Sequence, residues 1–201
     1  MTFSILSVCT GNICRSPVAE LILAERLARF PDVCVESAGT GALVGHDVPQ
    51  PAQRLARTVG IDASAHRARQ IDLAMIREAD LIVGMSRDHR RLIVESLPGA
   101  MRRAFTLREL ARIADVVEPE LSTIIPSSGA STVEDGMRAA VALAAALRGT
   151  VPPPPSPEAF DIIDPYRRND DVFAQSFDEL APAAARVAAF LATAATLTDP
   201  R

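Results

Sequence analysis

The sequence predicts a single α/β domain, built on a four-stranded parallel sheet with helices on both of its faces. Two observations lead to this fold class. Short apolar runs alternate with segments of helical periodicity, and the 201 residues are enough for one good core. Parallel strands need crossover connections, which helices supply. We therefore expect ligands to bind beyond the carboxyl ends of the strands.

The first half of the chain holds two strands and two helices. The apolar run at 3–8 predicts a strand that ends in a polar loop, and Pro17 is a typical opening residue of the helix that follows. Residues 33–37 form the second expected strand. A helix over 50–59 follows, and Gly60 should end it.

Two more strands follow in the second half. A buried strand at 80–85 precedes a helix over 87–96, which a Leu-Pro-Gly sequence stops. A short strand near 103–105 comes next. The helix after it should begin with a capping box made by Thr106 and Glu109.

The remaining residues predict two helices joined by a proline-rich segment. Ser131 and Glu134 form a second capping box, which opens a helix over 131–148. The prolines at 152–155 favour an extended spacer, with a ligand for another domain as the alternative. Pro182 should kink or divide the last helix. The buried stripe of this helix consists of Phe173, Phe177, Leu180, Ala184, Val187 and Leu191.

Composition argues against several classes of function. The net charge of -4 argues against a nucleic-acid-binding protein, which needs an excess of basic side chains to neutralise phosphates. All lysine and arginine positions are arginines, so an arginine alone is weak evidence for a site. Residues 1–8 have no basic leader, and we find no apolar run of the roughly 20 residues that span a bilayer. Three cysteines and three scattered histidines give neither a disulfide framework nor zinc spacing. We expect a cytoplasmic protein with no metal and no cofactor.

The polar loop after the first strand is the best candidate for chemistry. Backbone amides of a tight loop and the positive end of a helix make an anion cradle. Gly11 permits the sharp turn, Asn12 tolerates left-handed geometry, and Arg15 can offer two parallel donors to a phosphoryl group. The same positive field favours the thiolate of Cys9, which makes this residue a candidate nucleophile. The alternative is a small buried hydrophobe at that position.

Residues 9–20, CTGNICRSPVAE, closely resemble the phosphate loop of the low-molecular-weight protein tyrosine phosphatases. The resemblance covers most of the chain except about residues 114–157, and it implies a single phosphatase domain over 1–201 with a helical insertion there. We expect the inserted helix to pack near the route to Asp164, where it would shape access or offer a partner surface. Further matches are 36–40 (ESAGT), 66–70 (HRARQ), 79–85 (ADLIVGM) and 161–166 (DIIDPY).

The resemblance implies a role for each matching residue. Cys9 would form a phosphocysteine, Arg15 would clamp the transferring group, and Asp164 would act as general acid and then as base. From the residues alone, an Asp before a proline is more often a turn residue. Ser37 and His66 would join Asn12 in fixing the shape of the loop. The residues that would bind phosphate are Thr10, Gly11, Asn12, Ile13, Cys14 and Ser16.

The chain departs from this family around the substrate. Tyr166 would form one aromatic wall, but Ala42 or Leu43 stands where many members have a second one, and Arg167 follows Tyr166. These changes weaken a preference for phosphotyrosine. We expect a phosphorylated protein or a small phosphomonoester as substrate, no nucleic-acid or membrane partner, and a monomer or weak dimer.

Three alternatives stay open at this point. An arsenate reductase uses the same loop, but without cysteines after Cys34 this chain would need an external thiol. A phosphate-binding module without turnover is the second. The third concerns Cys14, which by resemblance would form a protective disulfide with Cys9 and otherwise simply packs beneath the loop.

Overall fold

The computed structural model describes residues 2–198 and contains one four-stranded parallel sheet, which confirms the predicted fold class. The strand order is β2-β1-β3-β4, and every neighbouring pair is parallel. The two central strands therefore end side by side at the carboxyl edge of the sheet. The strands are β1 (Phe3–Cys9), β2 (Val33–Gly39), β3 (Leu81–Gly84) and β4 (Ala104–Thr106).

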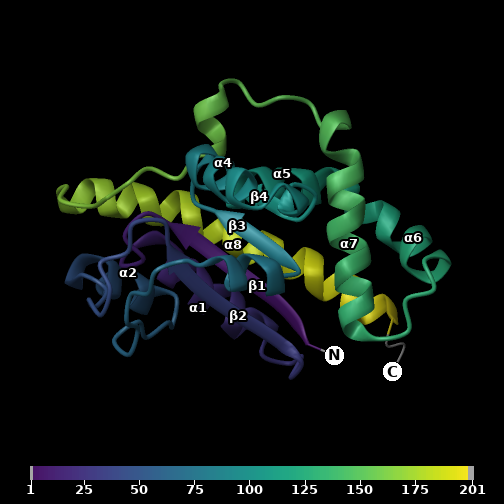
Figure 1. Cartoon of the computed structure of the whole chain (residues 1–201), viewed down its shortest axis with the longest axis horizontal. Helices are drawn as coiled ribbons and strands as arrows, with labels where there is room; N and C mark the ends of the chain where they lie inside the picture. Colours follow the sequence, from purple (N-terminus) through teal and green to yellow (C-terminus); the bar gives the residue numbers. More distant parts are fainter. Residues whose placement is uncertain (1, 199–201) are drawn as a thin grey trace.

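Helices cover both faces of the sheet, but unequally (Figure 1). The larger core lies between the sheet and the long helices, whereas the smaller core lies under α3 and α4. The helices are α1 (Arg15–Leu27), α2 (Gln50–Thr58), α3 (Leu73–Glu78), α4 (Arg87–Ser96), α5 (Leu107–Val117), α6 (Leu121–Ser127), α7 (Val133–Leu147) and α8 (Asp170–Thr198). Of these, α3 and α6 were not predicted.

Side-chain alternation along β1 decides which core each residue joins. Phe3 and Ile5 point into the larger core, while Leu6 and Val8 point into the smaller one. Cys9 follows the period of Phe3 and Ile5, so it faces α1 and α8. The strand thus delivers the cysteine to the edge where the chain turns into α1.

The helix α1 begins earlier than predicted, at Arg15 instead of Pro17. Pro17 still lies in the first turn, where backbone amides have no partner within the helix, so its missing N–H removes no bond. The predicted cap of α7 is also wrong by one residue. Thr132 caps this helix by accepting a hydrogen bond from the backbone N–H of Asp135, and Ser131 lies outside it. Gly149 lies in the 3-10 turn that follows.

The helix α8 runs unbroken for 29 residues with Pro182 inside it, so the proline does not divide it. It packs against α1, α5 and α7, and this packing outweighs the unfavourable propensity of one residue. By length and hydropathy alone α8 could cross a membrane, and half of its most apolar stretch is buried within the described residues.

The helix α7 lies far from the place predicted for it. Arg138 of α7 bonds to the carbonyl of Thr2 and to the carboxylate of Asp80, which stand at the amino ends of β1 and β3. Figure 1 shows α6 and α7 at the end of the molecule where β1 begins and α8 ends, with α2 toward the other end. The prediction that this helix borders the route to Asp164 is therefore wrong, because it packs at the opposite edge of the sheet.

Candidate active site

The phosphate loop, residues 9–16, wraps around the sulfur of Cys9. The backbone N–H of Asn12 donates to the Sγ atom at 3.3 Å, and the hydroxyl of Ser16 donates at 3.0 Å. Asn12 has a φ of 53°, so the loop uses the left-handed geometry expected there. Two donors aimed at one sulfur stabilise a negative charge on it.

Arg15 and Asp164 meet over this loop. Arg15 is only 6% exposed; its Nη1 donates to the carbonyl of Ile162 at 3.1 Å, and its Nη2 lies 2.5 Å from Oδ2 of Asp164. Both groups border one pocket of about 110 Å³, together with the sulfur. The pocket lining consists of Cys9, Thr10, Gly11, Ile13, Cys14, Arg15, Gly41, Leu43, Asp164 and Tyr166.

A buried network holds the loop from behind. The amide Nδ2 of Asn12 donates to the hydroxyls of Ser16 and Ser37, at 3.0 and 2.8 Å. Its Oδ1 accepts from the backbone N–H of Arg69, and its carbonyl lies 2.8 Å from Nε2 of His66. The structure thus brings Ser37 and His66 to Asn12, so that they fix the loop without facing the pocket.

Glu20 completes this network, and the sequence did not single it out. Its carboxylate accepts a hydrogen bond from Ser37 and lies 3.9 Å from Nδ1 of His66. Burial raises the pKa of Glu20, although the bond from Ser37 opposes the rise. Glu20 stands one helical turn after Ser16, and a Ser-to-Glu spacing alone cannot show that both turn inward.

The segment 161–166 carries Asp164 and is fastened at several points. The N–H of Ile162 donates to the carbonyl of Met85, and the N–H of Ile163 donates to the carboxylate of Glu179, both at 2.9 Å. Just before them, Asp161 accepts from the backbone and side chain of Arg87. The side chain of Asp164 accepts from the N–H of Tyr166 at 3.1 Å.

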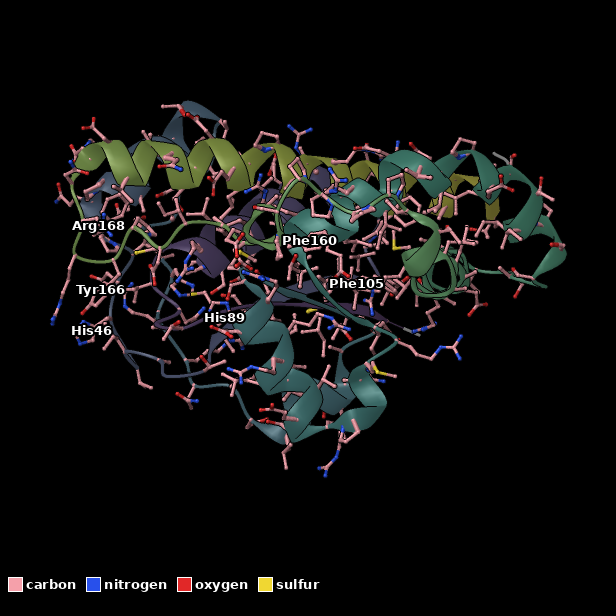
Figure 2. All side chains as sticks on the ribbon, turned by 90° about the horizontal axis from the view of Figure 1, so that it is seen from above. His46, His89, Phe105, Phe160, Tyr166 and Arg168 are labelled. Carbon is pink, nitrogen blue, oxygen red and sulfur yellow. The ribbon has the colours of Figure 1, made fainter. Side chains whose placement is uncertain are left out.

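Tyr166 forms one wall of the pocket and is 41% exposed. The guanidinium of Arg167 lies 5.1 Å from the centre of its ring, and Arg167 itself has a φ of 59°. Figure 2 shows Tyr166 at the same end of the molecule as His46 and Arg168. Of Ala42 and Leu43, the two positions considered for a second aromatic wall, Leu43 lines the pocket, so this wall is aliphatic.

His89 is a second residue that the sequence analysis missed. It lies in the first turn of α4, is 4% exposed, and reaches Thr10 of the phosphate loop with its Nε2 atom. Its Nδ1 lies 2.9 Å from the hydroxyl of Ser86, the N-cap of the same helix. In the sequence, a histidine three residues after a helix-capping serine does not indicate a contact with Thr10.

The remaining cysteines differ in position. Cys14 is buried in the pocket lining, and burial raises its pKa to about 12, helped by the nearby Cys9 and Asp164. Cys34 is exposed on β2 and does not line the pocket. Within residues 2–198, no group of three His, Cys, Asp or Glu side chains is arranged to hold a metal ion.

Known proteins are similar to this chain in both sequence and fold. The chain is 36% identical to the low molecular weight protein-tyrosine-phosphatase Ptp of Acinetobacter johnsonii over 104 residues, 52% of this chain and 71% of that protein. It is 37% identical to a protein-arginine-phosphatase of Geobacillus stearothermophilus over 115 residues, 57% of this chain and 76% of that one.

Solved structures agree with this similarity. The YwlE arginine phosphatase of Geobacillus stearothermophilus superimposes with a TM-score of 0.65 at 28% identity, over 95% of this chain and 94% of the other. The tyrosine phosphatase Wzb of Escherichia coli K30 superimposes with a TM-score of 0.63 at 27% identity, over 94% of this chain and 98% of the other.

The family model of low molecular weight phosphotyrosine protein phosphatases matches residues 4–123, which include the phosphate loop and all four strands. The relatives include proteins named as tyrosine phosphatases and one named as an arginine phosphatase. From the match, the relatives and the fold together, the chain is a phosphatase enzyme that belongs to the low molecular weight phosphotyrosine protein phosphatase family.

Proposed function

We propose that this enzyme hydrolyses phosphotyrosine in proteins through a phosphocysteine formed on Cys9. One observation carries the proposal: the sulfur of Cys9, the guanidinium of Arg15 and the carboxylate of Asp164 border one small pocket. A nucleophile, a clamp for phosphoryl oxygens and a proton donor are the three groups that phosphomonoester cleavage needs.

The reaction would proceed in two steps. The thiolate of Cys9 attacks phosphorus, the bond from phosphorus to the leaving oxygen breaks, and Asp164 gives its proton to that oxygen. Asp164 then takes a proton from water, whose oxygen attacks phosphorus and releases the thiolate and inorganic phosphate. Arg15 and the loop amides hold the phosphoryl oxygens throughout, so charge develops opposite fixed donors.

Apolar walls favour an aryl phosphate over a phosphorylated arginine. Ile13 and Leu43 line the pocket with aliphatic groups, and Tyr166 adds a ring. A phenyl ring would bury its faces there, whereas the extra N–H groups of a phosphoguanidinium would meet few acceptors. The buried free thiols Cys9 and Cys14 fit the reducing environment of a cytoplasmic enzyme.

Mass spectrometry and kinetics test this proposal together. An aryl phosphate and a phosphotyrosine peptide should be hydrolysed in the presence of a chelator, and rapid acid quenching should trap one phosphoryl group on the peptide that contains Cys9. Cys9→Ser should abolish turnover. Turnover by Cys9→Ser, or faster cleavage of phosphoarginine than of phosphotyrosine, would contradict the mechanism or the substrate. Arsenate-dependent oxidation of a small thiol would instead identify an arsenate reductase.

A further inference from the structure

A buried imidazole supports the phosphate loop at the residue that follows the nucleophile. Nε2 of His89 and Oγ1 of Thr10 lie 2.9 Å apart, although 79 residues separate them in sequence. Neither residue has a part in the two chemical steps above. Thr10 is exposed and lines the pocket, whereas His89 is 4% exposed and is not among the residues that line it.

The imidazole is neutral at physiological pH. Burial lowers the pKa of His89 to about 4, and Arg15 acts in the same direction, while Asp164, Asp88 and Asp161 oppose them. A neutral imidazole carries one N–H, so one ring nitrogen donates and the other accepts.

The neighbouring hydroxyls decide which nitrogen carries the hydrogen. Ser86 Oγ already accepts from the backbone N–H of His89 at 3.4 Å, and its own proton can go to Nδ1 of the ring. Nε2–H then donates to Oγ1 of Thr10, and the Thr10 proton stays free on the exposed side. The opposite tautomer would leave the half-buried Ser86 proton without a partner, which costs more than leaving an exposed one to water.

The first turn of α4 is a firm base for this ring. Gly84 ends β3 just before it, and a Cβ added to Gly84 would lie 3.1 Å from both the Cβ of His89 and the backbone nitrogen of Arg90. The helix therefore packs directly against the strand end. Gly84 is also paired with Val8, one residue before Cys9. The position of α4 is therefore fixed relative to the start of the phosphate loop.

We propose that His89 is a positioning residue for phosphate binding, which holds Oγ1 of Thr10 through Nε2–H and directs the Thr10 proton toward a phosphoryl oxygen in the pocket. The inference rests on the proposed function, because it assigns a further donor to the same site. Losing this donor should weaken the binding of inorganic phosphate about five- to tenfold, the size expected for one hydrogen bond in a site open to water.

Two substitutions of similar chemistry separate the two ring nitrogens. The amide of His89→Gln reaches the position of Nε2 and can still donate to Thr10, whereas the shorter amide of His89→Asn reaches only the position of Nδ1 and Ser86. We expect the inhibition constant of inorganic phosphate to change less than about twofold in His89→Gln and to rise about five- to tenfold in His89→Asn and in Thr10→Val. Melting curves of each variant report whether it is folded.

A double-mutant cycle tests whether His89 acts through Thr10. The pair His89→Asn with Thr10→Val should bind phosphate no more weakly than Thr10→Val alone, because His89 acts on phosphate only through the hydroxyl of Thr10. Equal effects of Gln and Asn at position 89, multiplied effects in the double variant, or unchanged phosphate inhibition in Thr10→Val would overturn the inference. Failure of the proposed function looks different, since the parent enzyme itself would then neither hydrolyse an aryl phosphate nor be inhibited by phosphate.

Discussion

The carboxylate of Asp164 lies 2.5 Å from the guanidinium of Arg15, so the proposed acid is paired with the cation that would clamp the phosphoryl group. Arg15 also donates to the carbonyl of Ile162, which leaves the pair in a fixed orientation. A phosphoryl group that enters the pocket must share Arg15 with Asp164. The negative charge of the unprotonated acid therefore opposes the binding of any oxyanion.

Asp164→Asn should separate binding from chemistry. Inorganic phosphate should bind severalfold more tightly because the competing charge is gone, while kcat should fall about 10²–10⁴-fold for poor leaving groups. Good leaving groups, which need no proton, should lose far less. Weaker phosphate binding would contradict the charge competition. An equal loss of kcat for nitrophenyl and phenyl phosphates, measured by steady-state kinetics, would exclude the acid role.

Asn12 is expected to matter more for its side chain than for its backbone. Asn12→Gly keeps the left-handed turn but loses the bonds to Ser16, Ser37 and the N–H of Arg69, which should cost about 2–4 kcal/mol. Asn12→Ala loses the same bonds and adds about 1 kcal/mol of backbone strain. Urea denaturation of both variants checks this order, and equal stability of Gly and Ala would show that the φ of 53° is not strained.

Gly39 lies where a side chain would strike the phosphate loop. A Cβ at this position would be 2.4 Å from the carbonyl oxygen of Thr10, so Gly39→Ala must push the loop away and should reduce kcat/KM at least tenfold and stability by about 1–3 kcal/mol. Gly99→Ala is the matched control, because a Cβ there would have no atom within 4 Å. Similar kinetics for the two variants would contradict this account.

The buried His89 should make the protein less stable in acid. Its pKa falls from 6.5 in the unfolded chain to about 4 in the folded one. Between these two pH values the unfolded chain binds more protons than the folded one. The stability that the neutral His89 contributes is therefore complete above pH 6.5. The free energy of unfolding falls by at most about 3 kcal/mol as the pH drops toward 4. We expect the free energy of unfolding of His89→Gln to depend less on pH across this window, as measured by urea denaturation. Parallel curves would show that His89 titrates normally.

Cys14 should protect the nucleophile only after Cys9 has been oxidised. Its pKa is raised to about 12 partly by the charge on Cys9, and that charge disappears when peroxide converts Cys9 to a sulfenic acid. The thiol of Cys14 can then displace water and form a disulfide. Excess peroxide carries an unprotected sulfenic acid on to the irreversible sulfinic acid, so the treated parent should recover with dithiothreitol and Cys14→Ala should not. Equal recovery would leave Cys14 as a packing residue only.

The order of strands and helices could be read from the sequence because each element carries a local signal. The apolar run at 3–8 and the capping box of Thr106 and Glu109 are examples, and the structure contains both the strand and the capping box. Ser131 and Thr132 show the limit of such signals. Each is followed three residues later by an acidic residue, so the sequence cannot decide which hydroxyl caps α7.

Outside the phosphate loop, the site could be predicted only where a resemblance supplied the distant partners. The loop itself carries Cys9 and Arg15, but nothing near Asp164 indicates that it meets Arg15. Glu20 and His89 were missed because their roles depend on tertiary contacts with Ser37, His66 and Thr10. A sequence pattern does not report which of many polar residues becomes buried.

Hydrogen bonds hold the segment 161–166 to α4 and to α8, which has a consequence for insertions and deletions in this chain. Arg87 grips Asp161 from α4, and Glu179 of α8 holds the amide of Ile163, so the acid is located by its immediate neighbours and not by the chain that leads to it. The chain that passes through α6 and α7 returns to these contacts with Arg87 and Glu179, which do not involve either helix. The loops around α6 and α7 could therefore change in length without moving Asp164, as long as the core residues of these helices, such as Ile125 and Met137, stay buried.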